Sequence, residues 1–258
     1  YGVSEPLKHE KVIFEMGNER DAAANWSFSE AQLEWYIKRA GAAVDAILKE
    51  FPDSKICLCG KTAPWGDAEN HRKWTKGLAS AMKGKFQYWS QHLYYAGNEI
   101  SIIEQYLNWV TEDLDSALGE NHGVQILMTE HAKWPKLGVG SADDLLTLES
   151  VLATGMFLTR MYRRTDMHAA HYHTFYSMNY RCWPMVVVLD DTVIPCGMEK
   201  MMKLFSENIG DRVVSAEYTG NSDRVDITKP ACKFSVLATP SGKREMTIFL
   251  VNRSADYD

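Results

Sequence analysis

Two glutamates stand where the chain leaves a strand-like run, and each has polar and aromatic neighbours. Glu19 follows Asn18 at the end of the stretch VIFEMG. Glu130 closes the run VQILMTE and precedes His131 and Trp134. Glutamate is disfavoured inside strands, so a carboxylate at this position marks a candidate site. The carboxyl ends of parallel strands gather at one edge of a sheet, so both side chains are expected there.

Histidines and tyrosines gather at the ends of two further strand-like runs. They are His92, Tyr94 and Tyr95 in FQYWSQHLYY, and His168, His171 and His173 in MHAAHYHTFY. Aromatic side chains are suited to stacking on sugar rings. Cleavage of a glycosidic bond needs one carboxylic acid for the leaving oxygen and a second carboxylate as nucleophile or base. Different environments let two carboxylates take these unequal roles. The residues therefore predict a glycosidase.

Other interpretations of the same residues stay open. A glutamate at a strand end can be a helix cap or a surface charge. Glu130, His131, His171 and His173 are also ligand types for zinc. However, neighbouring residues on one strand point to opposite sides, which argues against Glu130 and His131 binding one ion. We expect no metal ion and no organic cofactor at this site.

Composition limits the partners. The chain has 258 residues, 45% of them hydrophobic, so it can bury a sizeable core. Its net charge is −6 and no basic patch stands out, so we expect neither nucleic acid nor membrane as a partner. Five cysteines without a CxxC pair are typical of a reducing compartment, which favours a cytoplasmic location. No signal peptide is visible, although the chain begins at Tyr1 and its true N-terminus is not assured.

Strand and helix patterns alternate along most of the chain, which indicates parallel βαβ units. Strands are predicted at about 11–16, 55–60, 86–95, 124–131 and 167–176. Helices are predicted over 27–51, with Ser29 and Gln32 at capping-box spacing, and over 71–83, 100–120 and 141–164. A closed (β/α)8 TIM barrel needs eight strands, so about three leading units are absent. An open doubly wound sheet is the alternative.

The pattern changes beyond residue 210. The segment CKFSVLATPSGKREMTIFLVN predicts a β-hairpin with a Pro-Ser-Gly turn. We therefore expect two domains. Residues 1–210 would form an α/β catalytic barrel that lacks its first strands, and residues 211–258 would form part of an antiparallel β-sandwich.

Three motifs, EMGNERD, WSQHLYY and ILMTEHAKW, occur in an order and spacing that resemble the family 51 glycoside hydrolases, chiefly α-L-arabinofuranosidases. The helix DLLTLESVLATGMFLTRMYRRTD also resembles the helix before that family's last barrel strand, so the resemblance covers about residues 11–205. It implies a fragment that starts at barrel strand four. It also implies release of α-L-arabinofuranosyl residues from arabinose-containing oligo- or polysaccharides by a retaining, double-displacement mechanism.

The resemblance also implies roles for single residues. Glu19 matches the general acid/base, Asn18 the residue that hydrogen-bonds the sugar 2-hydroxyl, and Glu130 the nucleophile. Tyr94 matches a tyrosine that hydrogen-bonds the nucleophile, and His92 a histidine that lines the site. The other residues expected to contact substrate are His131, Trp134, His171 and His173.

The sequence departs from the family pattern at two places. The nucleophile usually has a Glu-Trp context, whereas Glu130 precedes His131. The last strand usually offers a glutamine, whereas this one offers His171, His173 or Thr174. Another retaining glycosidase of the same clan, such as an endo-glucanase or xylosidase, therefore stays open.

A non-catalytic half-barrel that serves as a binding or structural component is a further alternative. The open edges of an incomplete barrel would need the missing N-terminal barrel segment or another protein to cover them. The family resemblance also suggests a homo-oligomer.

Overall fold

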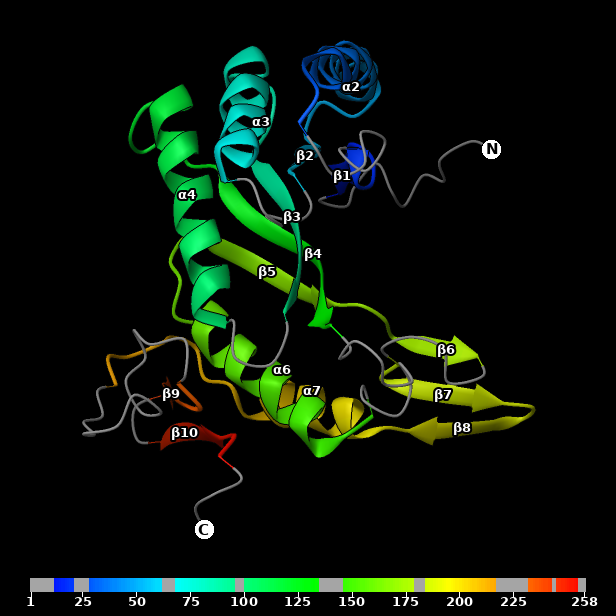
Figure 1. Ribbon diagram of the computed structural model, residues 1–258, viewed down its shortest axis with the longest axis vertical. Coiled ribbons are helices and arrows are strands. Elements are labelled where there is room, and N and C mark those ends of the chain that lie inside the picture. Colours follow the sequence, from blue (N-terminus) through cyan, green and yellow to red (C-terminus); the bar gives the residue numbers. More distant parts are fainter. Residues whose placement is uncertain are drawn as a thin grey trace. The chain divides into compact units, whose positions relative to one another are not determined.

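The computed structural model describes residues 12–20, 28–61, 68–95, 100–134, 146–178, 184–216, 232–242 and 245–254. Its main element is a five-stranded sheet (Figure 1). The strands are β1 (Ile13–Glu15), β2 (Lys55–Cys59), β3 (Tyr88–Tyr95), β4 (Gln125–Lys133) and β5 (Met167–Tyr172). The pairs β1–β2 and β2–β3 are parallel. Helices connect the strands up to β5, as the sequence predicts.

The strand order decides between the two predicted architectures. The strands lie in the sequential order β1-β2-β3-β4-β5. In a doubly wound sheet the strand order reverses at a switch point, whereas in a TIM barrel each strand lies beside the strand that precedes it in the chain. The sheet is therefore half of a (β/α)8 barrel, and the doubly wound alternative is wrong.

The chain divides into two compact units. One contains residues 1–93, 106–129 and 166–169, and the other contains residues 94–105, 130–165 and 170–258. The division crosses β3, β4 and β5, so it does not follow the predicted domain boundary at residue 210. That boundary stays a prediction.

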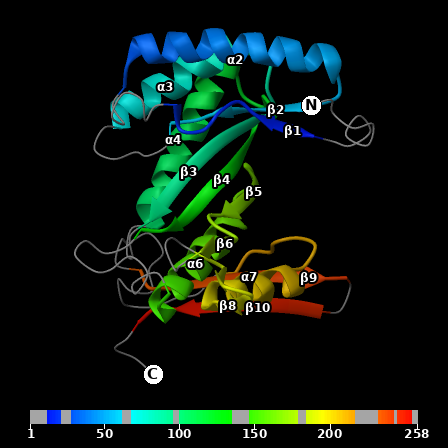
Figure 2. The same ribbon diagram turned by 90° about the vertical axis from the view of Figure 1, so that its right-hand side faces the viewer.

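In the first unit, two helices cover β1 and β2 (Figure 2). Helix α2 (Glu30–Glu50) begins at the predicted cap, where the Ser29 hydroxyl accepts a hydrogen bond from the Gln32 amide at 3.3 Å. Helix α3 (Ala68–Ala81) follows β2. Their apolar faces cover β2, which is buried from its second residue to its last, as expected for an inner strand of a parallel sheet.

The rings of Tyr36 and Trp74 connect helices α2 and α3 to each other and to strand β2. The ring of Tyr36 on α2 stacks on Trp74 of α3 at a centroid distance of 5.7 Å. The Trp74 indole donates to the carbonyl oxygen of Cys59 at 3.2 Å. Cys57 and Cys59 are buried thiols outside any disulfide.

In the second unit, helices pack on the C-terminal hairpin. Helix α6 (Leu148–Met161) contacts β9 (Phe234–Ser241), β10 (Glu245–Asn252) and α7 (Gly197–Asn208). Phe205 of α7 stacks on Phe249 of β10 at a centroid distance of 4.4 Å. The antiparallel pairing of β9 and β10 confirms the predicted hairpin.

Two parts of this unit are absent from the sequence prediction. One is α7, and the other is a small sheet of β6 (Tyr176–Met178), β7 (Val186–Leu189) and β8 (Thr192–Pro195). The predicted strand 167–176 is in fact two strands, because β5 ends at Tyr172 and β6 begins at Tyr176. The predicted helix over 141–164 is described from Leu148, and its first residues lie outside the described ranges.

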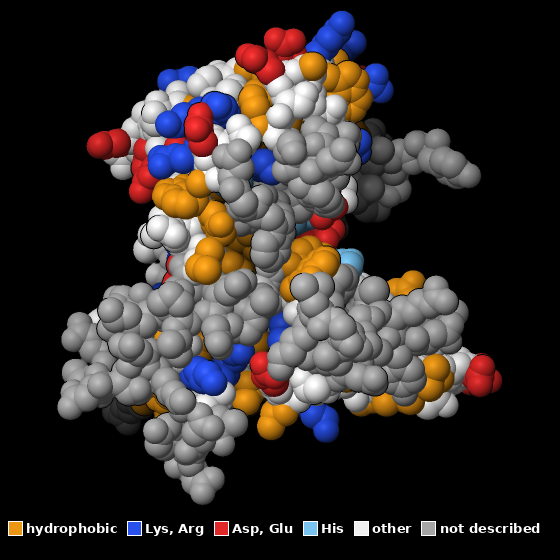
Figure 3. All heavy atoms as spheres, viewed as in Figure 1, with side chains coloured by type: hydrophobic (Ala, Val, Ile, Leu, Met, Phe, Trp, Pro, Cys, Tyr) orange, Lys and Arg blue, Asp and Glu red, His pale blue; other side chains and the backbone are white. Residues whose placement is uncertain are grey.

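Helix α4 (Ile100–Leu118) matches the predicted helix over 100–120. No helix in the described part of the chain is long and apolar enough to cross a bilayer. Acidic and basic side chains interleave over α2 and α3 (Figure 3), in keeping with the modest net charge.

Candidate active site

The backbone around Glu19 explains why the chain leaves β1 at this point. Gly17 has φ +103°, and Glu19 itself has φ +45°. Side chains other than glycine rarely adopt the φ of Gly17, so this turn requires glycine. A non-glycine residue at positive φ is uncommon and concentrates at functional sites. Glu19 is therefore held in a left-handed backbone conformation that glutamate rarely adopts.

Helix α2 holds this turn in place. The Tyr36 hydroxyl donates to the carbonyl oxygen of Met16 at 2.8 Å and accepts from the Cys59 amide at 2.9 Å. The Gln32 side-chain amide donates to the carbonyl oxygen of Arg20 at 2.9 Å. Burial raises the pKa of Tyr36, so the phenol keeps the proton that this contact uses. The residues before and after Glu19 are thus both fixed.

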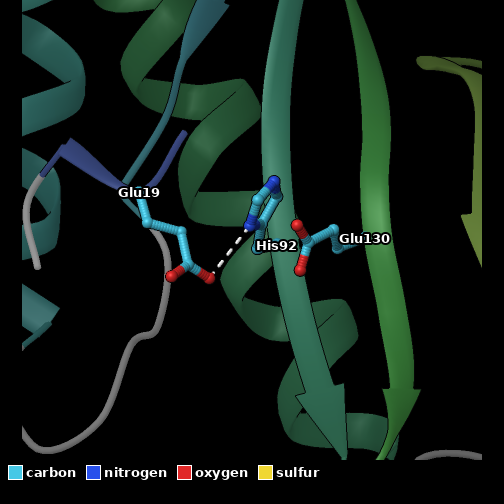
Figure 4. A group of neighbouring side chains, drawn as sticks. All are labelled: Glu19, His92 and Glu130. Atoms are coloured by element: carbon cyan, nitrogen blue, oxygen red, sulfur yellow. Dashed lines mark hydrogen bonds and ion pairs between the residues drawn. The ribbon is translucent and has the colours of Figure 1, made fainter. Parts of the chain in front are cut away.

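His92 lies between Glu19 and the strand β4. Its ring is 4% exposed, with Nδ1 3.1 Å from Oε1 of Glu19 and Nε2 2.9 Å from Oγ1 of Thr129. Figure 4 shows the glutamate directed at the imidazole of β3. Because both ring nitrogens have partners, the orientation of the ring is fixed.

A second carboxylate, Glu15, lies on the same strand segment as Glu19. Its Oε1 accepts hydrogen bonds from the Ser90 hydroxyl and from the Thr129 hydroxyl, the latter at 2.9 Å. It also lies 3.9 Å from Nε2 of His92. The sequence analysis did not select Glu15, Ser90 or Thr129. The period of two in β3 places Ser90 on the face of His92, and this signal was available from the sequence.

Glu130 has a different set of partners. The Tyr94 hydroxyl donates to its Oε2 at 2.7 Å and lies 3.3 Å from Nδ1 of His173. The indole of Trp134 meets the Tyr94 ring edge-on at 5.6 Å, and His173 does so at 6.3 Å. Trp134 is 42% exposed. The structure thus brings together four of the residues that the sequence analysis selected, namely Glu130, Tyr94, Trp134 and His173.

His131 does not join this group. It is completely buried, and its ring packs on Phe157 at 4.4 Å, on Tyr172 at 5.6 Å and on Tyr95 at 6.3 Å. Burial lowers its pKa to about 3. The structure therefore places His131 in the core, where it cannot reach a substrate, and the expectation of a substrate contact is corrected. The cause is strand alternation, which turns His131 to the side opposite Glu130.

Three other predicted residues lie elsewhere. Asn18 and His171 are exposed, the first beside Glu19 in the chain and the second on β5. His168 packs on the ring of Tyr88 at 4.6 Å. Tyr95, which also ends a strand, donates its hydroxyl hydrogen to Thr154 in the core.

Among the described residues, Glu19, His92 and Glu130 are a set with the ligand types for a metal ion. Both nitrogens of His92 already have hydrogen-bond partners, so coordination would break one of these contacts. We therefore assign no metal site to these residues.

The two glutamates belong to different compact units. His92 and Tyr94 are separated by one residue on β3, and Thr129 and Glu130 are adjacent on β4. These strands are neighbours in the sheet. Figure 4 draws Glu130 extending from β4.

A cavity of about 360 Å³ lies within the first unit, between the end of β1 and α2. Its lining includes Gly17, Arg20, Trp35, Arg39 and Ala43. The indole of Trp35 is 43% exposed, and the guanidinium of Arg39 lies 5.4 Å from its centre.

No protein-family profile matches this sequence, and no curated protein matches it. Solved structures do match the fold. The thermostable GH51 α-L-arabinofuranosidase from Thermotoga petrophila RKU-1 has a TM-score of 0.71 at 14% identity, over 92% of this chain and 51% of that chain. The family 51 α-L-arabinofuranosidase AbfB from Bifidobacterium longum has a TM-score of 0.69 at 12% identity, over 94% and 54%.

A β-porphyranase of glycoside hydrolase family 86 from Bacteroides plebeius also matches, with a TM-score of 0.63 at 17% identity, over 87% of this chain and 41% of that chain. The fold thus resembles one half of the (β/α)8 barrel of these glycoside hydrolases. The chain spans about half the length of the arabinofuranosidases that it matches.

Proposed function

We propose that this chain carries both catalytic glutamates of a retaining glycosidase, with Glu19 as general acid/base and Glu130 as nucleophile. The observation that carries the proposal is that the two carboxyl groups have chemically different partners. Oε1 of Glu19 lies 3.1 Å from Nδ1 of His92, whereas Oε2 of Glu130 accepts a hydrogen bond from Tyr94 at 2.7 Å. An imidazole can exchange a proton with a carboxyl group, and a phenol donates to a carboxylate. These partners suit an acid and a nucleophile, respectively.

In the first chemical step, a carboxylate oxygen of Glu130 attacks the anomeric carbon of the sugar. The bond from that carbon to the leaving oxygen breaks, and Glu19 gives its proton to that oxygen. A covalent glycosyl-enzyme forms, with the anomeric configuration inverted.

In the second step, a water molecule attacks the same carbon while Glu19, now a carboxylate, takes its proton. The bond to Glu130 breaks, and the sugar leaves with its original configuration after two inversions. This mechanism requires the two carboxyl groups to lie about 5–5.5 Å apart. A crystal structure with a sugar bound would measure this separation.

The aromatic and polar side chains beside Glu130 supply sugar contacts. We assign Trp134 a stacking contact, since its ring is partly exposed and braced by Tyr94. His173 and Asn18 supply hydrogen bonds to hydroxyl groups. Tyr94 fixes the direction of the nucleophile.

We propose terminal α-L-arabinofuranosyl groups as the substrate, on oligosaccharides or polysaccharides that carry arabinose. The motif resemblance and the likeness to two family 51 arabinofuranosidases support this choice. Another retaining glycosidase of the clan is the second candidate, because the likeness to a β-porphyranase is only slightly lower. A panel of aryl glycosides and polymers separates the two.

We also propose that further βα units complete the barrel. A closed barrel has eight strands, whereas five are present here. Among the described strands β1 pairs only with β2, so its other edge is available for a parallel strand. The cavity beside β1, with the exposed Trp35, is the surface that a preceding helix would cover. These units would come from a longer form of this chain or from a second protein.

The test is hydrolysis of 4-nitrophenyl α-L-arabinofuranoside, with the β-xyloside, the β-glucoside and porphyran as alternatives. Glu69→Ala is a matched control, since that glutamate is 78% exposed and pairs only with Lys73 on its own helix among the contacts described. We expect turnover of the arabinofuranoside by wild type and control. If only one of the other glycosides is hydrolysed, the substrate proposal changes to that glycoside and the proposed catalytic roles stay. No turnover of any substrate by this chain, alone or joined to the three leading βα units, would contradict the proposal.

A further inference from the structure

The chemistry of each group decides which atoms donate and which accept in the hydrogen-bond network around His92. Glu15 as a carboxylate can only accept hydrogen bonds. Its Oε1 lies within hydrogen-bond distance of the hydroxyls of Ser90 and Thr129, and these two hydroxyls lie 2.6 Å from each other. The next contact is from Oγ1 of Thr129 to Nε2 of His92, at 2.9 Å.

The Thr129 hydroxyl has one hydrogen, and this decides the direction of the chain. If Thr129 donated to His92, its oxygen would face the carboxylate of Glu15 at 2.9 Å without a hydrogen between them. If Thr129 instead donates to Glu15 or to Ser90, its oxygen is left to accept, and Nε2 of His92 donates to Thr129. The approach of Nε2 to Glu15, at 3.9 Å, also favours a hydrogen on this nitrogen.

Nδ1 of a neutral His92 then carries no hydrogen, and it lies 3.1 Å from Oε1 of Glu19. Two lone pairs at this distance would repel, so one proton must lie between the two atoms. It belongs either to the carboxyl group of Glu19 or to an imidazolium. In both cases the pair has one shared proton and no net charge.

We propose that Glu15 is a positioning residue that acts through Thr129 to set the tautomer of His92, so that His92 and Glu19 share the proton used in catalysis. The use of this proton in catalysis rests on the proposed function. The arrangement itself is a property of the folded chain. Glu15 does not touch the substrate in this account.

The shared proton connects both steps of the reaction. Glu19 gives the proton to the leaving oxygen, and its carboxylate then faces a nitrogen without hydrogen. The contact regains its hydrogen bond when Glu19 takes a proton from the attacking water. The network therefore favours the return of Glu19 to its protonated form. One proton leaves with the departing group and one is taken from water, so the balance closes.

Two further titratable groups are near this network in the sequence. They are Tyr94, two residues after His92 on β3, and Glu130, which follows Thr129 on β4. Tyr94 donates its hydrogen to Glu130. The charges on the β1 segment that face His92 are Glu15 and Glu19.

The direct test is nitrogen-15 NMR of the full chain labelled at histidine, with the His92 signals assigned by their loss in His92→Gln. We expect Nε2 of His92 to carry a hydrogen in the wild type. In Glu15→Gln the carboxamide can present its NH2 group as well as its oxygen to Thr129, so the preference for a hydrogen on Nε2 should weaken. The matched control Glu69→Gln should keep the wild-type signals.

Two further variants guard against a folding defect in Glu15→Gln. Thr129→Ser keeps the hydroxyl and should keep the hydrogen on Nε2, whereas Thr129→Val should remove that preference. A hydrogen on Nδ1 with a bare Nε2 in the wild type would overturn the proposal. So would an unchanged preference for Nε2 in a folded Thr129→Val.

Kinetics supply a second readout where turnover is found. We expect Glu15→Gln to lower kcat/KM by about tenfold or more for a substrate with a poor leaving group, which needs the proton. An activated aryl glycoside should lose less than about threefold, since it needs little proton transfer. The NMR result stands without activity, so failure of the proposed function and failure of this inference are distinguishable.

Discussion

The ends of β1 and β4 hold their glutamates in different ways. Glu19 lies on a left-handed turn that α2 braces from the outside, and its partner is an imidazole. Glu130 remains within the regular strand β4, and its partner is the phenol of Tyr94. The comparison shows that two like carboxyl groups have unlike partners, which is the basis of the roles that we propose for them. A group that must give and take a proton needs a partner that can do the same, whereas a nucleophile needs only a donor.

The largest expected effect comes from the β4 side. Glu130→Ala removes the atom that forms the covalent intermediate, so hydrolysis should fall by at least about 10⁴-fold for every substrate. Initial rates with an aryl α-L-arabinofuranoside measure this. Substantial activity in the folded variant would contradict the assignment of the nucleophile.

The β1 side should respond in a substrate-dependent way. Glu19→Ala removes the acid, so substrates with poor leaving groups should lose about 10²–10⁴-fold in kcat/KM. Activated aryl glycosides should lose much less in their first step, because their leaving group departs without a proton. Equal losses for both substrate types would show that Glu19 does not act as the acid.

Tyr94→Phe should have a smaller effect on kcat/KM, and it tests the hydrogen bond on the β4 side. The variant loses the 2.7 Å hydrogen bond to Glu130 but keeps the ring that packs against Trp134. A hydrogen bond to a charged group contributes about 1.5–3 kcal/mol, so kcat/KM should fall by about 10- to 100-fold. The loss should be similar for good and poor leaving groups. A loss confined to poor leaving groups would assign Tyr94 to the acid side instead.

The smallest effect concerns stability and uses one buried histidine from each unit. Burial lowers the pKa of His131 to about 3 and that of His71 to about 4, from 6.5. The unfolded chain therefore takes up these protons first as the pH falls. Each histidine should lower the free energy of unfolding between about pH 6.5 and its folded pKa, by up to about 1.4 kcal/mol per pH unit.

Chemical denaturation at a series of pH values measures this slope. Phenylalanine keeps an aromatic ring without the titrating group, so His131→Phe and His71→Phe should each flatten the acid dependence. The control is His168→Phe, since that ring is exposed and should contribute little. An unchanged slope in both core variants would contradict the stated cause.

Much of the barrel half could be predicted because its signals are local. The alternation of strand and helix patterns gave the five strands and the helices between them. Glu19 and Glu130 stood out since each carboxylate follows an apolar run. The left-handed φ of Glu19 could not be predicted, although Gly17 indicated a turn.

The misses have physical causes too. Glu15 and Thr129 lie inside strands, where a polar residue carries no sign of facing the barrel interior, whereas the period of two in β3 could have placed Ser90 beside His92. The turn of the β7–β8 hairpin is Asp190-Asp191, with Asp190 at φ +49°, instead of the common Asn-Gly or Asp-Gly. His131 was misplaced although strand alternation turns it to the side opposite Glu130, where it packs on Phe157 of α6.

The most direct test of the two roles is the product formed with azide and an activated glycoside. In Glu19→Ala, azide should attack the glycosyl-enzyme and give a glycosyl azide of retained configuration. In Glu130→Ala, azide should take the place of the nucleophile and give the inverted glycosyl azide. Proton NMR of the two products reads the configuration directly. The reverse pattern, or the same configuration from both variants, would contradict the account of how the two strand ends divide the chemistry.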